Sequence, residues 1–589
     1  MPELLVYVLL ALVGGVLCRR LSLRPDGWSV ALGTLLSVFQ VVGRAYRDHG
    51  TFRALWASPA AAAENLALLV LGALALTLLA RLALWLMDRP AARLRSAEGG
   101  VPAPARFLPA LAVFALLLVA WLPYLVVFFP GSFTFDGTNQ MDVFYGFLPK
   151  TNHHPYLMTL LMGSVFDLGR RLGSDNLGIA LWVGLQTLVQ AAALSLSVRS
   201  MRRMGAPTMA LAATTAFFAL TPAWGAYAQA FLKDTLFASL LCLYVTLLAE
   251  AWWRNRRAGS ASVPQAAGVL ALGIALCLSR HNGAFVVALC LPFVVAALSG
   301  ARSRVLAAGA AAGALAAYLA VSSLLLPALG VEPAGRQESL GALFQMTARY
   351  VKEAPGDVEP WEREAIEAVL DYDVLVEAYN GSKSDAVKVT YHGTDEDLAA
   401  YFRAWASMGL RHPGVYLDAF LNGLYGYLYV DISCPHDTWD YRFYTYGPLP
   451  GVPDDFEVSY VMPEEVRGTV IGACNVFQGL PVVGLLGHCG VYSWALILAC
   501  VHVLRSGRVR NLLVAAPSAV MLLICFVSPV NGYLRYMLPI MSTVPLTLWF
   551  SCLSGAVDPA PRLHRGRHAA GGYTGSDDKG AHGRGKSRG

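Results

Sequence analysis

One short polar stretch in a very apolar sequence carries many of the side chains that could do chemistry. Residues 135–155 read FDGTNQMDVFYGFLPKTNHHP and contain Asp136, Gln140, His153 and His154. A carboxylate in such a loop can take a proton from a hydroxyl group. The ordinary interpretations are that Asp136 caps a helix and that the His-His-Pro turn opens the next helix.

Charged residues at the ends of other apolar runs extend this candidate site. Lys233 and Asp234 open one run, Arg280 and Asn282 join two runs, and Arg535 opens the last run. Each of them alone could snorkel to the membrane surface or cap a helix. Together with a carboxylate they suit a phosphate or diphosphate, because Arg binds phosphate oxygens bidentately and Lys adds a point charge.

The elements that must position these residues are membrane spans. The chain has 589 residues, of which 56% are apolar and 14% are charged, whereas soluble domains carry about 25% charged residues. Because apolar runs of about 20 residues can cross a bilayer, we predict an all-α polytopic membrane protein with about 13 transmembrane helices. The predicted spans are 3–18, 27–43, 65–87, 106–129, 176–198, 208–223, 234–253, 264–279, 284–299, 305–327, 484–504, 511–528 and 536–553.

Basic clusters set the predicted orientation of the spans, because loops rich in Arg and Lys stay in the cytoplasm. Such clusters lie at 19–20, 89–95, 199–203, 254–257, 302–304 and 505–510. With the N-terminus outside, the alternation places the candidate site on the extracytoplasmic side of the cell membrane. Arg44, Arg47 and Arg53 do not fit, because they fall on the predicted outer side.

The chain divides into regions of different composition. Residues 328–468 contain 24 acidic and 10 basic residues with helix-like stretches, so we predict a helical extracytoplasmic insert there. The predicted regions are an N-terminal three-span membrane region at 1–105, a membrane core at 106–327 with the outer loop 130–155, the acidic insert at 328–468, C-terminal spans at 469–555 and a disordered basic cytoplasmic tail at 556–589.

Short motifs carry a resemblance to a known superfamily. They are FPGSFTFDGTNQ from Phe129, NHHPYLMTLLMG from Asn152, FLKDTLFA from Phe231, SRHNG from Ser279 and YLRYMLP from Tyr533. An Asp in the first large outer loop, followed by a His-Pro that opens the next helix, resembles the GT-C membrane glycosyltransferases. These include protein O-mannosyltransferases and aminoarabinose transferases. The overall pattern looks most like a bacterial family of unknown function related to them.

The resemblance implies a GT-C-like membrane core and a reaction. A sugar would pass from a polyprenyl-phosphate donor to an acceptor hydroxyl outside the membrane, during assembly of a cell-envelope glycan or glycoprotein. Asp136 would act as the general base, or would orient the acceptor and a divalent metal. His154 would position the acceptor or the donor phosphate.

The resemblance also implies a substrate-binding set, within which Arg535 is the strongest candidate for the lipid phosphate. The set comprises His153, Gln140, Lys233, Asp234, Arg280, Asn282 and Arg535. One departure concerns the loop, where many relatives carry an Asp-Glu pair and Gly137 follows Asp136 here. If a metal needs a second carboxylate, Asp142 is a candidate.

Two other functions stay open at this stage. A transporter or flippase of an anionic lipid-linked substrate would place charges near the bilayer midplane and is often built from repeats, but no internal repeat is apparent. A non-catalytic scaffold would only display the acidic insert. No nucleic-acid-binding motif and no Walker or dinucleotide fingerprint is found, as expected for a lipid-linked donor. The acceptor can be a glycan, a lipid or a protein.

Overall fold

The computed structural model describes residues 2–96, 105–431 and 456–557, and this part of the chain is almost entirely helical. Its only strands, β1 (Ser132–Phe133) and β2 (Ala230–Phe231), pair in parallel. Seven of its helices are long and apolar enough to cross a bilayer. A further span is formed if α8 (Thr208–Leu220) and α9 (Pro222–Ala228), bent by 50°, count as one. The protein is therefore an all-α, multi-pass membrane protein.

The predicted thirteen spans are not confirmed, because seven helices of the described residues, or eight spans with the bent pair, are long and apolar enough to cross a bilayer. The long spans are α2 (Gly27–His49), α3 (Pro59–Ser96), α4 (Ala110–Val127), α7 (Asp175–Arg203), α10 (Lys233–Ala258), the run from α13 (Ala301–Ala320) to α14 (Leu326–Ala328), and α24 (Leu534–Val557). The other predicted spans coincide with α1 (Pro2–Arg20), the bent α8–α9 pair and the shorter helices α11 (Val263–Ser279), α12 (Asn282–Ala297), α22 (Cys489–Arg505) and α23 (Ala516–Phe526). Apolar runs overestimate helix length where their ends wind into turns, as in the 3-10 segment Val509–Val514.

Two spans, α10 and α24, form the centre of the bundle and are mostly buried against their neighbours. α10 packs against α7, α11 and α24. Trp252 of α10 meets Phe550 of α24 edge to face, with 4.8 Å between the ring centres. Closer to the N-termini of both helices, the Ser542 hydroxyl donates to the Ala238 carbonyl oxygen at 3.3 Å. Because both helices are so well packed, the side chains at their first residues are held in fixed positions.

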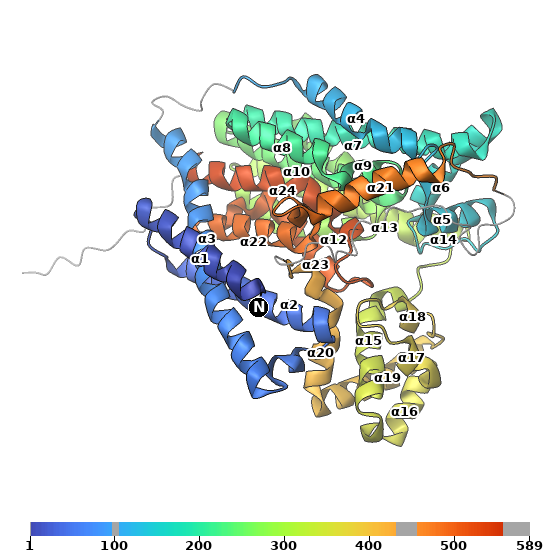
Figure 1. Cartoon of the computed structure of the whole chain (residues 1–589). Helices are drawn as coiled ribbons and strands as arrows, with labels where there is room; N and C mark the ends of the chain where they lie inside the picture. The colour runs from blue at the N-terminus through green and yellow to red at the C-terminus, as the bar shows by residue number, and fades with distance from the viewer. Residues whose placement is uncertain (1, 97–104, 432–455, 558–589) are drawn as a thin grey trace, which may run out of the picture.

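The candidate residues gather at one end of this bundle. α5 (Phe135–Tyr145), α10, α12 and α24 begin there and α11 ends there, and α5 lies at the right of Figure 1 beside α6 (Tyr156–Leu172). α6 packs against α5 and α7. The basic end of α10 lies away from the site, where Arg256 donates to the Ala297 carbonyl oxygen at 3.2 Å.

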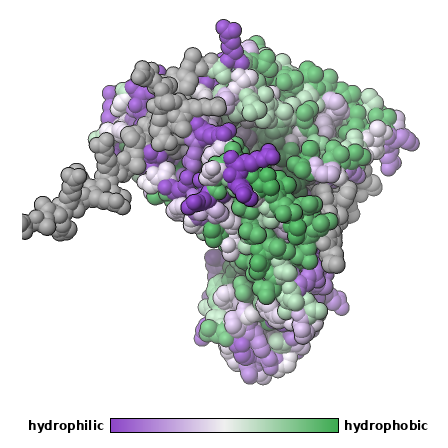
Figure 2. Space-filling view, turned by 60° about the vertical axis from the view of Figure 1, so that its left-hand side comes forward, coloured by the Kyte–Doolittle hydropathy of each residue, from purple (hydrophilic) through white to green (hydrophobic). Residues whose placement is uncertain are grey.

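A helical unit, here called the insert, projects below the bundle in Figure 1. It precedes α21 (Glu464–Gly479) along the chain. Its helices are α15 (Gln337–Glu353), α16 (Pro360–Glu367), α17 (Leu375–Ala378), α18 (Asp385–Lys388), α19 (Asp395–Arg411) and α20 (Pro413–Leu424). Phe344, Tyr401 and Met408 belong to a hydrophobic core of its own. In Figure 2 this unit is the more hydrophilic lower lobe beneath the apolar surface of the bundle.

The three arginines that did not fit the predicted orientation bind acidic side chains. Arg44 and Arg47 reach Glu3 at 3.0 and 3.6 Å. Arg53 reaches Glu353 of the insert at 3.1 Å. These arginines therefore have a structural role on this side of the bundle, because they join the N-terminal helices to one another and to the insert.

Candidate active site

Two strand–helix junctions with the same geometry build the centre of the site. β1 leads into α5 and β2 leads into α10, and the strands pair with Ser132 opposite Ala230 and Phe133 opposite Phe231. Continued along both segments, this register sets Asp136 opposite Asp234 in the first turns of the two helices. A helix N-terminus carries partial positive charge, which favours a carboxylate at this position.

Hydrogen bonds and a close approach fix the first junction against β2. Thr134 Oγ1 donates to the Phe231 carbonyl oxygen at 2.9 Å and accepts the Gly137 amide at 3.1 Å, which caps α5. A Cβ atom at Gly137 would lie 2.7 Å from both the ring and the carbonyl oxygen of Phe231. A glutamate at this position would collide with β2, which explains why no Asp-Glu pair occurs in this loop.

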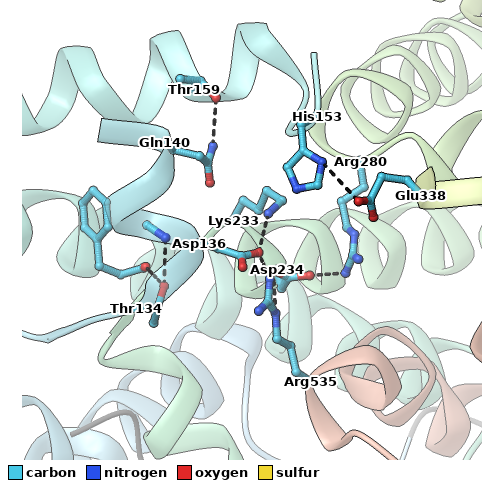
Figure 3. A network of polar contacts seen from close by, with 12 residues as sticks. Thr134, Asp136, Gln140, His153, Thr159, Lys233, Asp234, Arg280, Glu338 and Arg535 are labelled. Carbon is cyan, nitrogen blue, oxygen red and sulfur yellow. Dashed lines mark hydrogen bonds and ion pairs between the residues drawn. The ribbon is translucent and has the colours of Figure 1, made fainter. Parts of the chain in front are cut away.

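An ion-pair network joins the two junctions (Figure 3). Lys233 Nζ donates to Asp136 Oδ2 at 2.9 Å. Arg535 spans both carboxylates, because its Nη2 donates to Asp136 and also to Asp234 Oδ2, the latter at 2.8 Å. Arg280 donates to the other oxygen of Asp234. These five side chains, here called the charged cluster, bring together residues up to 399 positions apart.

The side chains of the charged cluster differ in their exposure to solvent. The side chains of Asp234, Lys233 and Arg535 are 1%, 5% and 8% exposed. Those of Arg280 and Asp136 are 16% and 21% exposed. Asp136 is thus the more accessible of the two carboxylates.

Positive charge predominates among the five side chains, since three cations face two carboxylates and leave a net charge of +1. The N-termini of α5, α10 and α24 add partial positive charges at the same place. The helix dipole disfavours Lys233 and Arg535 in first turns, so tertiary contacts hold them there. The arrangement favours an anion, because both the cations and the helix N-termini would bind one.

The carboxyl group of Asp136 is ionised at neutral pH. Burial raises the pKa of Asp136, but the positive charges of Arg535 and Lys233 outweigh this effect and hold the pKa well below its usual range. A carboxylate that keeps both cations is a poor proton acceptor, because their charges stabilise its ionised form. Proton transfer to Asp136 therefore requires that these cations find another partner.

The two histidines of the loop have different surroundings. His154 lies in the electrostatic range of Asp136 and Lys233, and burial together with the charge of Lys233 holds its pKa well below the usual value, so it is neutral at pH 7. His153 is more exposed and its Nδ1 lies 3.9 Å from Glu338 Oε1 of the insert (Figure 3). The structure thus brings His154 beside the charged cluster and turns His153 toward the insert.

The remaining predicted residues lie near the charged cluster without joining it. Gln140 lies one turn after Asp136, is fully buried and donates to Thr159 Oγ1 of α6 at 3.1 Å. Asn282 begins α12, and its side chain makes no hydrogen bond within the described ranges. Asp142 is buried six residues beyond Asp136 and faces a different side of α5. The second carboxylate beside Asp136 is therefore Asp234.

A divalent metal, which is one of two options for the role of Asp136, does not suit this donor set. Among the residues that the structure describes, no group of three or more His, Cys, Asp or Glu side chains is arranged to hold a metal ion. A divalent cation between Asp136 and Asp234 would also meet the positive charges of Lys233, Arg280 and Arg535. The residues fit an anion better than a metal.

Two features of the site were not predicted from the sequence. One is the pairing of the aspartates, although the pattern Phe-x-x-Asp at 133–136 and again at 231–234 signals it. The other is the link made by His281, whose Nε2 contacts the Asn152 carbonyl oxygen at 2.8 Å and whose Nδ1 contacts the Tyr318 hydroxyl at 3.2 Å. That link has no local sequence signal, because its partners lie on a distant loop and helix.

Fold and site together define an all-α, multi-pass membrane protein with a net-positive charged cluster at one end of its bundle. The chain belongs to a family of unknown function, DUF6020, whose model matches residues 147–558. No curated protein and no solved structure matches the chain. The family match includes Lys233, Asp234, Arg280 and Arg535 and begins after Asp136.

Proposed function

We propose that this protein is a membrane glycosyltransferase that moves a sugar from a polyprenyl-phosphate donor to an acceptor hydroxyl outside the cytoplasm. The observation that carries the proposal is that Lys233 and Arg535 both donate to the accessible Asp136 at one end of a membrane bundle. The resemblance of the surrounding motifs to GT-C glycosyltransferases supports the same interpretation.

The three cations would bind the donor phosphate. Arg535 offers a planar fork of donors and Lys233 offers a point charge. Arg280 donates to Asp234, which also binds Arg535, and adds a third positive charge. Transfer leaves negative charge on the departing lipid phosphate, and fixed cations at that position stabilise the transition state. The charged cluster therefore accounts for binding of the donor and for stabilisation of its leaving group.

Asp136 would accept the proton of the acceptor. The acceptor oxygen attacks the anomeric carbon and forms a new C–O bond, while the bond from that carbon to the phosphate oxygen breaks. The polyprenyl phosphate leaves with the bonding electrons, and the acceptor proton passes to Asp136 and then to solvent. Attack opposite the leaving group inverts the configuration of the sugar.

The basic ends of the helices support an extracytoplasmic position of this site in the cell membrane. Arg202, Arg256 and Arg505 lie in the last turns of α7, α10 and α22, and such ends stay in the cytoplasm. The charged cluster lies at the first turns of α10 and α24, at the opposite end. We therefore assign the protein to cell-envelope glycan or glycoprotein assembly, with the donor lipid held against the apolar surface of the spans.

The position of the charged cluster argues against the transporter alternative. A transporter or flippase would hold its substrate near the bilayer midplane, at broken helices. Here the charges occupy the first turns of α5, α10 and α24 rather than their centres. The cluster thus serves a reaction at one membrane surface better than passage across the membrane.

A release assay tests the proposal. Membranes that contain the full chain are given mannose, glucose or arabinose linked to a polyprenyl phosphate that is radiolabelled in its polyprenyl chain, and free polyprenyl phosphate is measured. We expect release with at least one donor by the wild-type chain, loss of release with Asp136→Asn, and retention with the control Asp142→Asn on the same helix. Release that is no greater than in membranes without the protein, for every donor, would contradict the proposal.

A further inference from the structure

We propose that Asp136 and the donor phosphate compete for the same two cations, so that phosphate binding displaces Asp136 from Lys233 and Arg535 and thereby frees it to act as the base. This inference rests on the proposed function and adds an order of binding to it. The lipid-linked donor binds first, and the acceptor hydroxyl then meets a carboxylate that has lost its cations.

The two carboxylates of the charged cluster are held unequally. Asp234 is almost fully buried and accepts from Arg280 through one oxygen and from Arg535 through the other. Asp136 is partly exposed, and both of its cations donate to the same oxygen, Oδ2. Within the described ranges no hydrogen bond reaches its other oxygen. Asp234 therefore acts as a fixed counter-ion, whereas Asp136 is the partner that can leave.

The position of Asp136 Oδ2 is where a phosphate oxygen would be bound best. Lys233 Nζ and Arg535 Nη2 converge on this point, and both groups form their strongest hydrogen bonds with anionic oxygens. The phosphodiester of the donor carries one negative charge on two non-bridging oxygens, so Lys233 and Arg535 can each bind a separate oxygen, whereas Asp136 offers both of them only Oδ2. A lipid phosphate can therefore replace Asp136, while Asp234 keeps Arg280 and Arg535 in place as a positioning residue.

Displacement would change what Asp136 can do. While Lys233 and Arg535 bind it, their charges lower its affinity for a proton. Once the phosphate takes both cations, the carboxylate stands next to the leaving group with a negative charge that is no longer paired. A proton acceptor would thus form only where a donor is already bound.

Equilibrium binding to variants of the full chain tests the competition. The protein is reconstituted in lipid nanodiscs, and the dissociation constants of decaprenyl phosphate and of neutral decaprenol are measured. We expect Asp136→Asn to bind decaprenyl phosphate about tenfold more tightly than the wild-type chain, which corresponds to about 1.4 kcal/mol. Asp136→Glu keeps the competing charge and should stay near the wild-type affinity, whereas Asp234→Asn should bind more weakly. Decaprenol should not distinguish the variants.

The outcomes separate this inference from the proposed function. If Asp136→Asn binds decaprenyl phosphate no more tightly than the wild-type chain, the competition is wrong, and the proposed function stands where the wild-type chain still prefers decaprenyl phosphate to decaprenol. If the wild-type chain shows no such preference, both are wrong. Should Asp136→Asn fail to fold, Asp136→Ser carries the same expectation, because serine is also small, polar and uncharged.

Discussion

The charge network around Asp136 and a second network around Asp418 both pair aspartate with arginine, but they differ in solvent exposure and in charge balance. Asp418 of α20 is fully buried and accepts from the Tyr46 hydroxyl at 2.7 Å and the Thr51 hydroxyl at 2.6 Å. It also pairs with Arg349 at 3.0 Å. Neutral donors thus complete the shell of Asp418, whereas Asp136 depends on cations alone.

The balance of charge separates the two networks further. Arg349 and Arg53 face Asp418 and Glu353, so the ion-paired groups of this network sum to zero. The network lies between α2 and the insert and joins them. A buried charge is therefore no sign of function by itself. Excess positive charge beside an accessible carboxylate is the feature that distinguishes the Asp136 network.

The largest expected difference between the networks is in catalysis. Asp136→Asn should lower the rate of polyprenyl phosphate release about 10²–10⁴-fold, because it removes the proton acceptor. The matched variant Asp418→Asn should keep the wild-type rate per folded molecule. The initial rate in the release assay, normalised to folded protein, measures both. An equal loss of rate in the two variants would contradict a catalytic role that is specific to Asp136.

A large effect on stability is expected where one cation serves two acids. Arg535→Gln leaves Asp136 and Asp234 without their shared partner, and breaking a buried ion pair in this way costs about 3–5 kcal/mol. Arg535→Lys, which keeps the charge but not the fork, should recover part of this loss. Unfolding in detergent with increasing denaturant measures the difference. Wild-type stability of Arg535→Gln would show that the charged cluster is not coupled as described.

A smaller effect is expected in the Asp418 network. Asp418→Asn removes the ion pair with Arg349 but keeps an acceptor for Tyr46 and Thr51, so we expect a loss of about 1.5–3 kcal/mol. The insert should also become easier to detach from α2, as seen by limited proteolysis. Asp373→Asn, in an exposed pair with Arg363, is the control and should change neither measurement. Weaker binding of decaprenyl phosphate by Asp418→Asn would contradict the assignment of this network to structure alone.

The smallest effect is a dependence of stability on pH. Burial holds the pKa of folded His154 well below the usual 6.5, so the unfolded chain binds a proton below that pH and the folded chain does not. Stability should therefore fall as the pH drops through this range, by at most about 1.4 kcal/mol per pH unit. The lowered pKa of Asp136 reduces stability only as the pH falls below the unfolded value of 3.8, so its effect does not overlap with that of His154.

The variant His154→Gln checks this dependence, because it removes the titrating group. Thermal unfolding between pH 7.5 and 5.5 should show a shallower decline for the variant than for the wild-type chain. His281, whose pKa burial also lowers, is unchanged in the variant, so part of the slope should remain. Identical slopes in the two proteins would place His154 outside the charged surroundings described here.

Much of this organisation could be predicted from the sequence, because apolar runs and isolated charges are local signals. The membrane class follows from composition, and Asp136, Lys233, Asp234, Arg280 and Arg535 stand out as polar residues at span ends. The predicted number of spans is not confirmed, since apolar helices such as α11 and α23, with 17 and 11 residues, are shorter than the seven long spans.

The pairing of the charges could not be predicted either, because it depends on contacts far apart in the chain. The register of β1 and β2 sets Asp136 opposite Asp234, and because each strand has only two residues, the repeated Phe-x-x-Asp at 133–136 and 231–234 is a weak local signal of it. The role of Gly137 follows from its contact with Phe231. Arg53 shows the same limit, because its partner Glu353 lies in another region of the chain.

The most direct test of the central claim is a cryo-EM structure of the full chain in nanodiscs with decaprenyl phosphate. The account predicts phosphate density between Lys233 and Arg535, with the Asp136 carboxylate turned away from both and the contacts of Asp234 with Arg280 and Arg535 intact. Phosphate density elsewhere on the protein, with the ion pairs of Asp136 unchanged, would contradict the assignment of the charged cluster to a lipid-linked donor.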